Sequence, residues 1–138
     1  MSSRMIFLNL PVRDVSRSRI FYEALGWQVS QEFSDDEAAC IVIDENICAM
    51  LLTREYFATY GARPVTDTRD TVNAVYGLAL ASAREVDALT TAALAAGATE
   101  EVDEAKRAQE RRVGMHSRTF LDPDGHQWEP FCMGNPWR

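Results

Sequence analysis

The sequence contains no long apolar segment: no run of apolar residues approaches the roughly 20 that a membrane-spanning helix requires. It also begins without the apolar block and cleavage site of a secretion signal, so we expect a cytoplasmic protein. Cysteine is scarce, with only Cys40, Cys48 and Cys132, and no CxxC pair occurs. We therefore expect no disulfide framework, and we predict that Cys40 and Cys48, which lie in strand-like runs, are small buried apolar residues.

Basic residues are also in short supply. The 14 Lys and Arg residues are outnumbered by 21 Asp and Glu, which gives a net charge of −7, and no Lys/Arg cluster offsets it. Because a phosphate backbone would be repelled, the charge argues against nucleic acid as a partner. What remains is the composition of an ordinary globular protein, and 138 residues are enough for one domain.

The first half of the chain, about residues 4–53, is predicted to read strand, helix and then three strands. Asp14 is the expected N-cap of the helix and Gly26 ends it. The expected elements are a strand at 5–12, a helix at 14–25, and strands at 27–33, 38–43 and 47–53.

The second half, about residues 74–133, repeats this order. Ser82 and Glu85 form a capping box, and Gly97 ends the helix. A shift of 71 residues places Asp14 on Glu85 and Gly26 on Gly97, which predicts an internal repeat. The expected elements are a strand at 75–81, a helix at 85–96, strands at 98–102, 114–121 and 126–132, and a turn at Asp122–Gly125.

Two segments fall outside this pattern. Residues 54–73 form a connector in which Glu55–Tyr60 is expected to be a short helix. The densely charged stretch 100–112 has two interpretations: a solvated loop that can be partly helical, which we favour, or a mobile flap over a cleft.

Two motifs at opposite ends of the chain carry a resemblance to a known family. Leu10-Pro-Val-Arg-Asp14 with Phe21-Tyr22-Glu-Ala-Leu-Gly-Trp27, and Leu121-Asp-Pro-Asp-Gly-His-Gln-Trp-Glu129, resemble the opening and closing segments of the vicinal oxygen chelate superfamily. That superfamily includes glyoxalase I, the bleomycin-resistance proteins and the extradiol dioxygenases. The resemblance implies an α+β fold over residues 1–138 as a single domain, with two βαβββ modules in a partly open barrel around a shared cleft.

From the resemblance and the repeat together, we expect one concave sheet with both helices on its convex side. Superfamily members of this length usually pair, so we also expect a homodimer.

Metalloenzymes of the superfamily hold a divalent ion at four inward-facing positions. Carried over one at a time, these positions are Phe7, counted back from the N-cap Asp14; Leu78, counted back from Gly97; Glu129, counted from the turn glycine Gly125; and Leu51, placed by aligning the turn at Asp44 with that at Asp122 and uncertain by one residue. Three of them cannot donate to a metal, and a lone carboxylate does not hold a divalent ion against water. We therefore expect neither a metal nor another cofactor.

The leading hypothesis is a protein that binds a small organic molecule without a metal, much as the antibiotic-binding members of the superfamily hold cationic drugs. Glu129 would pair with a basic group of the ligand. Under the alternative interpretation the apolar residues only fill the barrel, and Glu129 pairs with an internal arginine such as Arg118. The residues expected to line the cleft are Phe7, Asn9, Leu51, Leu78, Glu129 and Phe131.

A second class of function also remains open. The chain would then be a glyoxalase-like (lactoylglutathione-lyase-like) or dioxygenase-like enzyme with a degenerate metal site, and Glu129 is the best candidate for its general base. The two histidines are not expected to act as ligands. His126 should face the outside of the barrel, opposite to Glu129, and His116 should be a surface or hydrogen-bonded residue that shares a face with Arg118.

Overall fold

A computed structural model of the chain describes residues 4–134, so the two ends of the expected 1–138 domain lie outside the described residues. The chain divides into two compact units, the first ending at Asp67 and the second beginning at Thr68. This boundary falls inside the predicted connector. Each unit has its own sheet and its own helices, and each is described here by itself.

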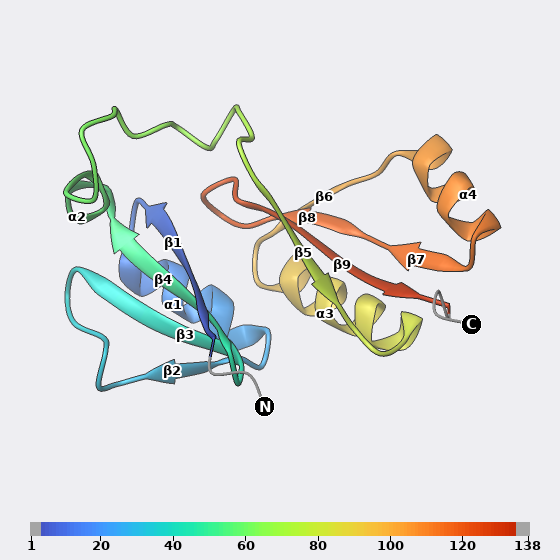
Figure 1. Cartoon of the computed structure of the whole chain (residues 1–138), viewed down its shortest axis with the longest axis horizontal. Coiled ribbons are helices and arrows are strands. Elements are labelled where there is room, and N and C mark those ends of the chain that lie inside the picture. The colour runs from blue at the N-terminus through green and yellow to red at the C-terminus, as the bar shows by residue number, and fades with distance from the viewer. Residues whose placement is uncertain (1–3, 135–138) are drawn as a thin grey trace. The chain divides into compact units, whose positions relative to one another are not determined.

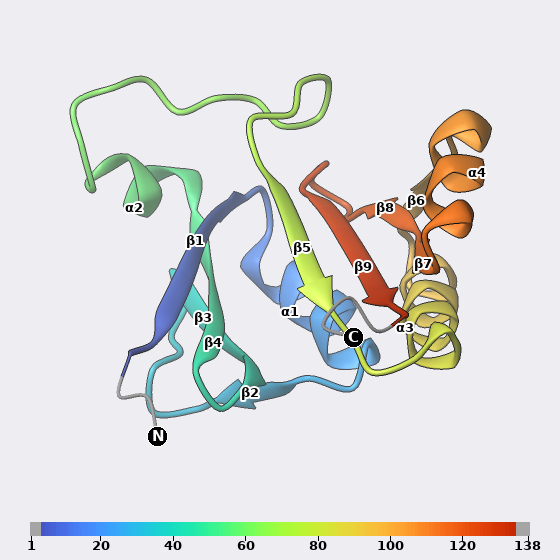
Figure 2. The same cartoon turned by 45° about the vertical axis from the view of Figure 1, so that its right-hand side comes forward.

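The first unit contains the five elements that the sequence predicts. They are β1 (Ile6–Val12), α1 (Val15–Ala24), β2 (Gln28–Ser30), β3 (Ala38–Asp44) and β4 (Ile47–Thr53). The strands form one sheet in the order β1-β4-β3-β2, in which β1 runs parallel to β4 and the other neighbours are antiparallel. Helix α1 lies across one face of this sheet (Figures 1 and 2).

Local chemistry sets the two ends of α1. The Asp14 carboxylate accepts a hydrogen bond from the Arg17 N–H at 3.0 Å, and Gly26 has φ = 91°, a conformation that residues with a Cβ avoid. The helix buries Phe21 and Tyr22, and the Tyr22 ring stacks on Trp27 with centroids 5.8 Å apart. Burying a side chain of this size stabilises the fold by about 1.5–3 kcal/mol.

Helix α2 (Arg54–Ala58) follows β4 directly, and Thr53 caps it. The second unit then contains β5 (Val75–Ala79), α3 (Ala83–Ala95), β6 (Thr99–Glu101), α4 (Glu104–Arg112), β7 (Met115–Ser117), β8 (Thr119–Leu121) and β9 (Gln127–Met133). Its sheet has the order β5-β9-β8-β6, and β7 also pairs with β9. As in the first unit, the first strand is parallel to the last, which confirms the predicted repeat and the α+β class.

The two helices that follow the first strands differ in length. Helix α1 has 10 residues and α3 has 13, because the capping serine Ser82 begins α3 at Ala83 rather than at residue 85. The N-caps Asp14 and Ser82 therefore lie 68 residues apart, whereas Gly26 and Gly97 lie 71 apart. A single shift of 71 is wrong for the first strands, and an odd correction of three residues reverses the face on which a strand residue lies.

Two other expectations also need correction. The strands form two sheets of four and five strands rather than one concave sheet. The strand expected at 114–121 is interrupted at Arg118, so that β7 and β8 are separate. The stretch 100–112, for which we favoured a loop that can be partly helical, is helical over most of its length, in α4, and begins with residues of β6. Cys40 and Cys48 are buried free thiols, as predicted. Over residues 4–134, no helix has the length and apolar character that crossing a membrane requires.

Candidate functional site

The predicted site residue Glu129 lies on the less buried face of the second sheet. Along β9, buried residues such as Trp128 and Pro130 alternate with the partly exposed Gln127, Glu129 and Phe131. In the sheet, Glu129 pairs with Gly77 of β5. At Gly77 an added Cβ would meet the Phe131 ring at 3.4 Å, so an aromatic ring borders the glycine beside the carboxylate.

Leu78 does not lie on this face. It pairs with Pro130, so it shares the face of Trp128 and lies opposite to Glu129. The earlier assignment was wrong because it counted back from Gly97 through the longer helix. Counted from the N-cap, as Phe7 is from Asp14, the equivalent residue is Val75, which is 50% exposed and pairs with Gln127.

The first unit needs the same correction at Leu51. Phe7 and Asn9 pair with Cys48 and Met50, whereas Leu51 pairs with Leu10 on the opposite face and is fully buried. The pair Asn9–Met50 thus corresponds to Gly77–Glu129, and Met50 is the first-unit counterpart of Glu129.

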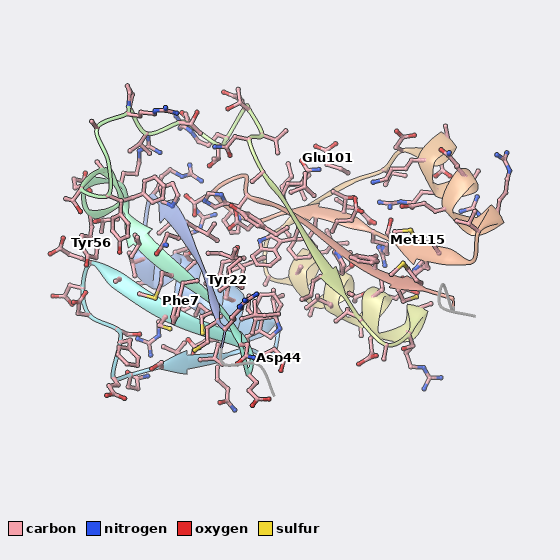
Figure 3. The ribbon with its side chains drawn as sticks, in the orientation of Figure 1. Phe7, Tyr22, Asp44, Tyr56, Glu101 and Met115 are labelled. Atoms are coloured by element: carbon pink, nitrogen blue, oxygen red, sulfur yellow. The ribbon has the colours of Figure 1, made fainter. Side chains whose placement is uncertain are left out.

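Phe7, labelled in Figure 3, has 47% of its surface exposed, and the side-chain amide of Asn9 donates to the Phe7 carbonyl at 3.4 Å. The structure thus brings Phe7 and Asn9 together on one sheet, and Glu129 and Phe131 on the other. A cleft shared by the two pairs stays a prediction.

The direct partner of Glu129 is a residue that the sequence analysis missed. Lys106 of α4 places its Nζ 2.6 Å from Oε2 of Glu129. The Glu129 side chain is only 17% exposed and that of Lys106 is 45% exposed. The one sequence signal was the pattern of 104–112, which consists of good helix formers with acids first and arginines last.

Helix α4 is held on the sheet by a buried polar network. Arg107 donates to the hydroxyls of Ser117 and Thr119, and the Ser117 hydroxyl donates to the Glu110 carboxylate at 2.7 Å. The Arg107 and Glu110 side chains are 12% and 10% exposed. Figure 3 labels Glu101 and Met115, which flank this helix in the chain. These contacts anchor α4 on the sheet of its own unit, and the flap over a cleft stays a prediction.

A second ionic cluster lies on the other side of β7 and β8. Arg118 donates two hydrogen bonds of 2.8 Å to Glu100 and also contacts Asp87 of α3, which is bonded to His116 at 2.9 Å. The hydrogen bond from His116, reinforced by Arg118, holds the pKa of Asp87 below its ordinary value. The guanidinium of Arg118 likewise lowers the pKa of Glu100. Arg118 is therefore not the partner of Glu129, and His116 is the hydrogen-bonded histidine that we expected.

His126 was expected on the outside, and that placement is wrong. Alternation along β9 does set it opposite to Glu129, but that face is the buried one, and His126 is only 5% exposed. Its backbone N–H donates to the Asp122 carboxylate at 2.8 Å, which also accepts from the Asp124 N–H. The turn Asp122–Gly125 is thus built as predicted.

The residues of these faces do not fit a divalent metal. At the positions corrected from the pairing, Phe7, Met50 and Val75 accompany Glu129, and only Glu129 supplies an oxygen donor. No group of three or more His, Cys, Asp or Glu side chains arranged to hold a metal ion occurs in the part of the chain that the structure describes. We therefore derive no reaction step through a metal.

Comparison with known proteins agrees with the fold. The model of the bleomycin resistance protein-like N-terminal family matches residues 4–44, which span β1 to β3. No curated protein matches the sequence.

Solved structures with the same fold cover nearly the whole chain. A glyoxalase/bleomycin resistance protein/dioxygenase family enzyme from Burkholderia phytofirmans has a TM-score of 0.75 and 17% identity, covering 96% of this chain and 100% of its own. A hypothetical protein from S. aureus has a TM-score of 0.71 and 23% identity, with coverages of 96% and 94%. A lactoylglutathione lyase from Agrobacterium tumefaciens has a TM-score of 0.66 and 15% identity, with coverages of 99% and 97%. Residues 4–44 thus match the bleomycin resistance protein-like family, and the fold along nearly the whole chain is that of these glyoxalase/bleomycin resistance structures.

Proposed function

We propose that the protein binds a small organic molecule through a cationic group held by Glu129, without a metal, in the manner of antibiotic sequestration. One observation carries the proposal: an ammonium group, that of Lys106, already lies 2.6 Å from the Glu129 carboxylate. The Lys106 Nζ occupies the position that the amine of a ligand would take.

The environment of Glu129 suits such an exchange. A carboxylate that is 17% exposed makes a stronger charge-assisted hydrogen bond than one in open water. Lys106, in contrast, is 45% exposed, and such pairs contribute only about 0–1 kcal/mol, so a ligand cation can displace it at low cost. Because Gly77 has no side chain and the Phe131 ring borders it, a flat apolar surface adjoins the carboxylate and can receive the ligand body.

The proposal extends to a homodimer. Apolar side chains at the start of β1 and β5, including Ile6, Phe7 and Val75, are about half exposed, and β1 and β5 are the first strands of their sheets. A second copy of the chain would cover such edges and apolar residues. Sedimentation at micromolar concentration should show twice the 15.5 kDa chain mass, and a single species of chain mass would contradict the dimer.

The binding test compares organic amines with neutral analogues of the same shape. Arylalkylamines should raise the melting temperature of the purified protein, whereas the corresponding alcohols should not, since binding to the native state stabilises it. Glu129→Gln should weaken amine binding about ten- to a hundredfold, as expected for loss of a charge-assisted hydrogen bond of about 1.5–3 kcal/mol. Lys106→Gln should strengthen binding because it removes the internal competitor. Glu101→Gln, which removes an exposed carboxylate of the same unit, is the matched control.

Two outcomes would count against the proposal. Equal binding of amines and alcohols would leave Glu129 without a role as the anchor. Stoichiometric zinc, nickel or iron bound through Glu129 after purification without chelator would instead favour the glyoxalase-like or dioxygenase-like enzyme.

A further inference from the structure

The short helix α2 carries two aromatic rings, Tyr56 and Phe57, and a third, Tyr60, follows just after its end; none of the three is buried. None of its five residues is buried, and Tyr56 and Tyr60 are 38% and 58% exposed. The rings nevertheless form one cluster. Tyr60 meets Tyr56 edge to face at 5.8 Å between centroids, and it lies nearly parallel to Phe57 at 6.4 Å. Ring contacts therefore order these three side chains, while the two tyrosines stay exposed to solvent. Figure 3 labels Tyr56.

The segment after α2 folds back to form a pocket next to this cluster. Arg54 donates to the backbone carbonyls of Thr66 and Val65 at 3.1 and 3.3 Å, which ties the end of the loop to the start of the helix. The pocket has a volume of about 360 Å³, and Phe57, Tyr60, Pro64 and Val65 are among its lining residues. Tyr60 belongs both to the aromatic cluster and to the pocket wall.

Two carboxylates, those of Asp35 and Glu37, lie near enough to Tyr56 to act on its hydroxyl. The pKa of Tyr56 is raised, first by its hydrogen bond with Tyr60 and further by the nearby carboxylates of Asp35 and Glu37. Asp35 uses one oxygen to cap the backbone N–H groups of Glu37 and Ala38. Within the described residues, Glu37 has no cationic side chain as a partner. An aromatic face also attracts cations through its quadrupole, so rings and carboxylates favour the same kind of ligand.

We propose that Tyr56, Tyr60 and the pocket beneath Tyr60 form a second binding site, specific for a small organic cation of the quaternary or tertiary ammonium class. The ammonium group lies against the tyrosine rings beside Glu37, and the hydrocarbon part of the ligand enters the pocket lined by Phe57 and Val65. The site belongs to the first unit and does not depend on Glu129. Arg63 also lines the pocket, and because its side chain is exposed and long it can keep its charge in water while a cation binds.

Choline is a suitable first probe, because it has an uncharged isostere in which a tert-butyl group replaces the trimethylammonium. The chain has four tyrosines, so ring-labelled tyrosine gives a simple NMR spectrum. The resonances of Tyr56 and Tyr60 should shift and saturate with choline at millimolar concentrations, whereas those of Tyr22 and Tyr76 should not move. The isostere should bind several-fold more weakly, since a cation–π contact of about 0.5–2 kcal/mol corresponds to about two- to thirtyfold in affinity.

Matched variants separate the contributions to this site. Tyr60→Leu should weaken choline binding within the same range, whereas Tyr60→Phe, which keeps the ring, should retain most of it. Glu37→Gln should weaken binding more than Glu45→Gln, an equal loss of charge at the turn between β3 and β4. Arg63→Gln should strengthen it. Glu129→Gln should leave it unchanged, so failure of this site and failure of the site at Glu129 can be told apart.

Three results would overturn the inference. They are the absence of saturable shifts at Tyr56 and Tyr60, equal affinity for choline and its isostere, and full retention of binding in Tyr60→Leu.

Discussion

The two units of the chain use one strand order for two different surfaces. In the first unit, residues 31–37 join β2 to β3 directly, and the face around Asn9 presents Phe7 and Met50. In the second unit, α4 lies between β6 and β7, and the equivalent face presents Glu129 paired with Lys106. The shared topology provides the strands, Glu129 among their residues, and the inserted helix provides its partner Lys106. The chemistry of this protein therefore depends on where its halves differ.

The largest expected difference between the units is the cost of replacing one glycine in each, Gly26 in the first and Gly125 in the second. Gly26 and Gly125 have almost the same φ, 91° and 89°, but a Cβ on Gly26 would meet nothing within 4 Å, whereas one on Gly125 would lie 2.0 Å from the Thr68 carbonyl oxygen. Gly26→Ala should cost about 1–2 kcal/mol from backbone strain alone. Gly125→Ala should cost about 4 kcal/mol or more, because the backbone must also move. Urea unfolding of both variants measures the difference, and equal costs would show that the contact with Thr68 yields easily.

The next largest effect concerns the helix that only the second unit has. Arg107→Met leaves the nearly buried Glu110 without its cation, and breaking a buried pair costs about 3 kcal/mol. In hydrogen exchange, we expect the backbone amides of α4 to lose protection, with little change in the first unit. Arg112→Met, at the exposed end of the same helix, is the control. The double variant Arg107→Met/Glu110→Met should lose less unfolding free energy than Arg107→Met alone, because it leaves no buried carboxylate without a cation.

The cluster around Arg118 predicts a dependence of stability on pH. The folded pKa values of Asp87 and Glu100 lie below their ordinary 3.8 and 4.5, so the unfolded chain binds protons first as the pH falls. Their stabilisation is present above the ordinary values and is lost as the pH falls through the lower folded ones. Both groups are partly exposed, so Arg118→Met should cost only about 1 kcal/mol at pH 7 and progressively less in acid. If the unfolding free energies of the unchanged protein and of Arg118→Met differ by the same amount at neutral and at acid pH, this prediction is contradicted.

The smallest effect on stability belongs to the proposed site itself. Lys106→Gln should change the free energy of unfolding by less than about 1 kcal/mol, because the lysine is largely exposed, and added salt should reduce even that difference. Thermal unfolding at low and high salt measures it. A large loss would show that the pair is a structural element of the second unit, which would weaken the proposal that a ligand displaces it.

Much of this fold could be predicted from the sequence because the signals are local. Asp14, Ser82, Gly26 and Gly97 mark helix ends through their own side chains or the lack of one, and all four act as predicted. The extent of α4 was not predicted, because its charged sequence buries little apolar surface and offers no apolar stripe to recognise. Its anchor, Arg107, depends on Ser117 and Thr119, which are ten and twelve residues away.

The site was harder to predict because successive residues of a strand lie on opposite faces, so an error of one residue puts a side chain on the wrong face. Glu129 and Phe7 were assigned from nearby landmarks, a turn glycine and an N-cap, and both are partly exposed on their sheets. Leu51 and Leu78 were assigned across a turn and across a helix, and both fell on the opposite face. Lys106 was not expected because its contact with Glu129 joins positions 23 residues apart.

The three extra residues of α3 also bear on how such a duplicated chain can change its length. Three residues are close to one turn of a helix, so α3 continues the same buried stripe from Val86 through Thr90 to Ala93. The same insertion in a strand would turn every later side chain to the wrong side of the sheet. A gene for this fold can therefore gain or lose codons in threes or fours within its helices while both sheets keep their registers. Strands tolerate only even changes or a bulge, so divergence between the halves of the chain should accumulate in helices and loops.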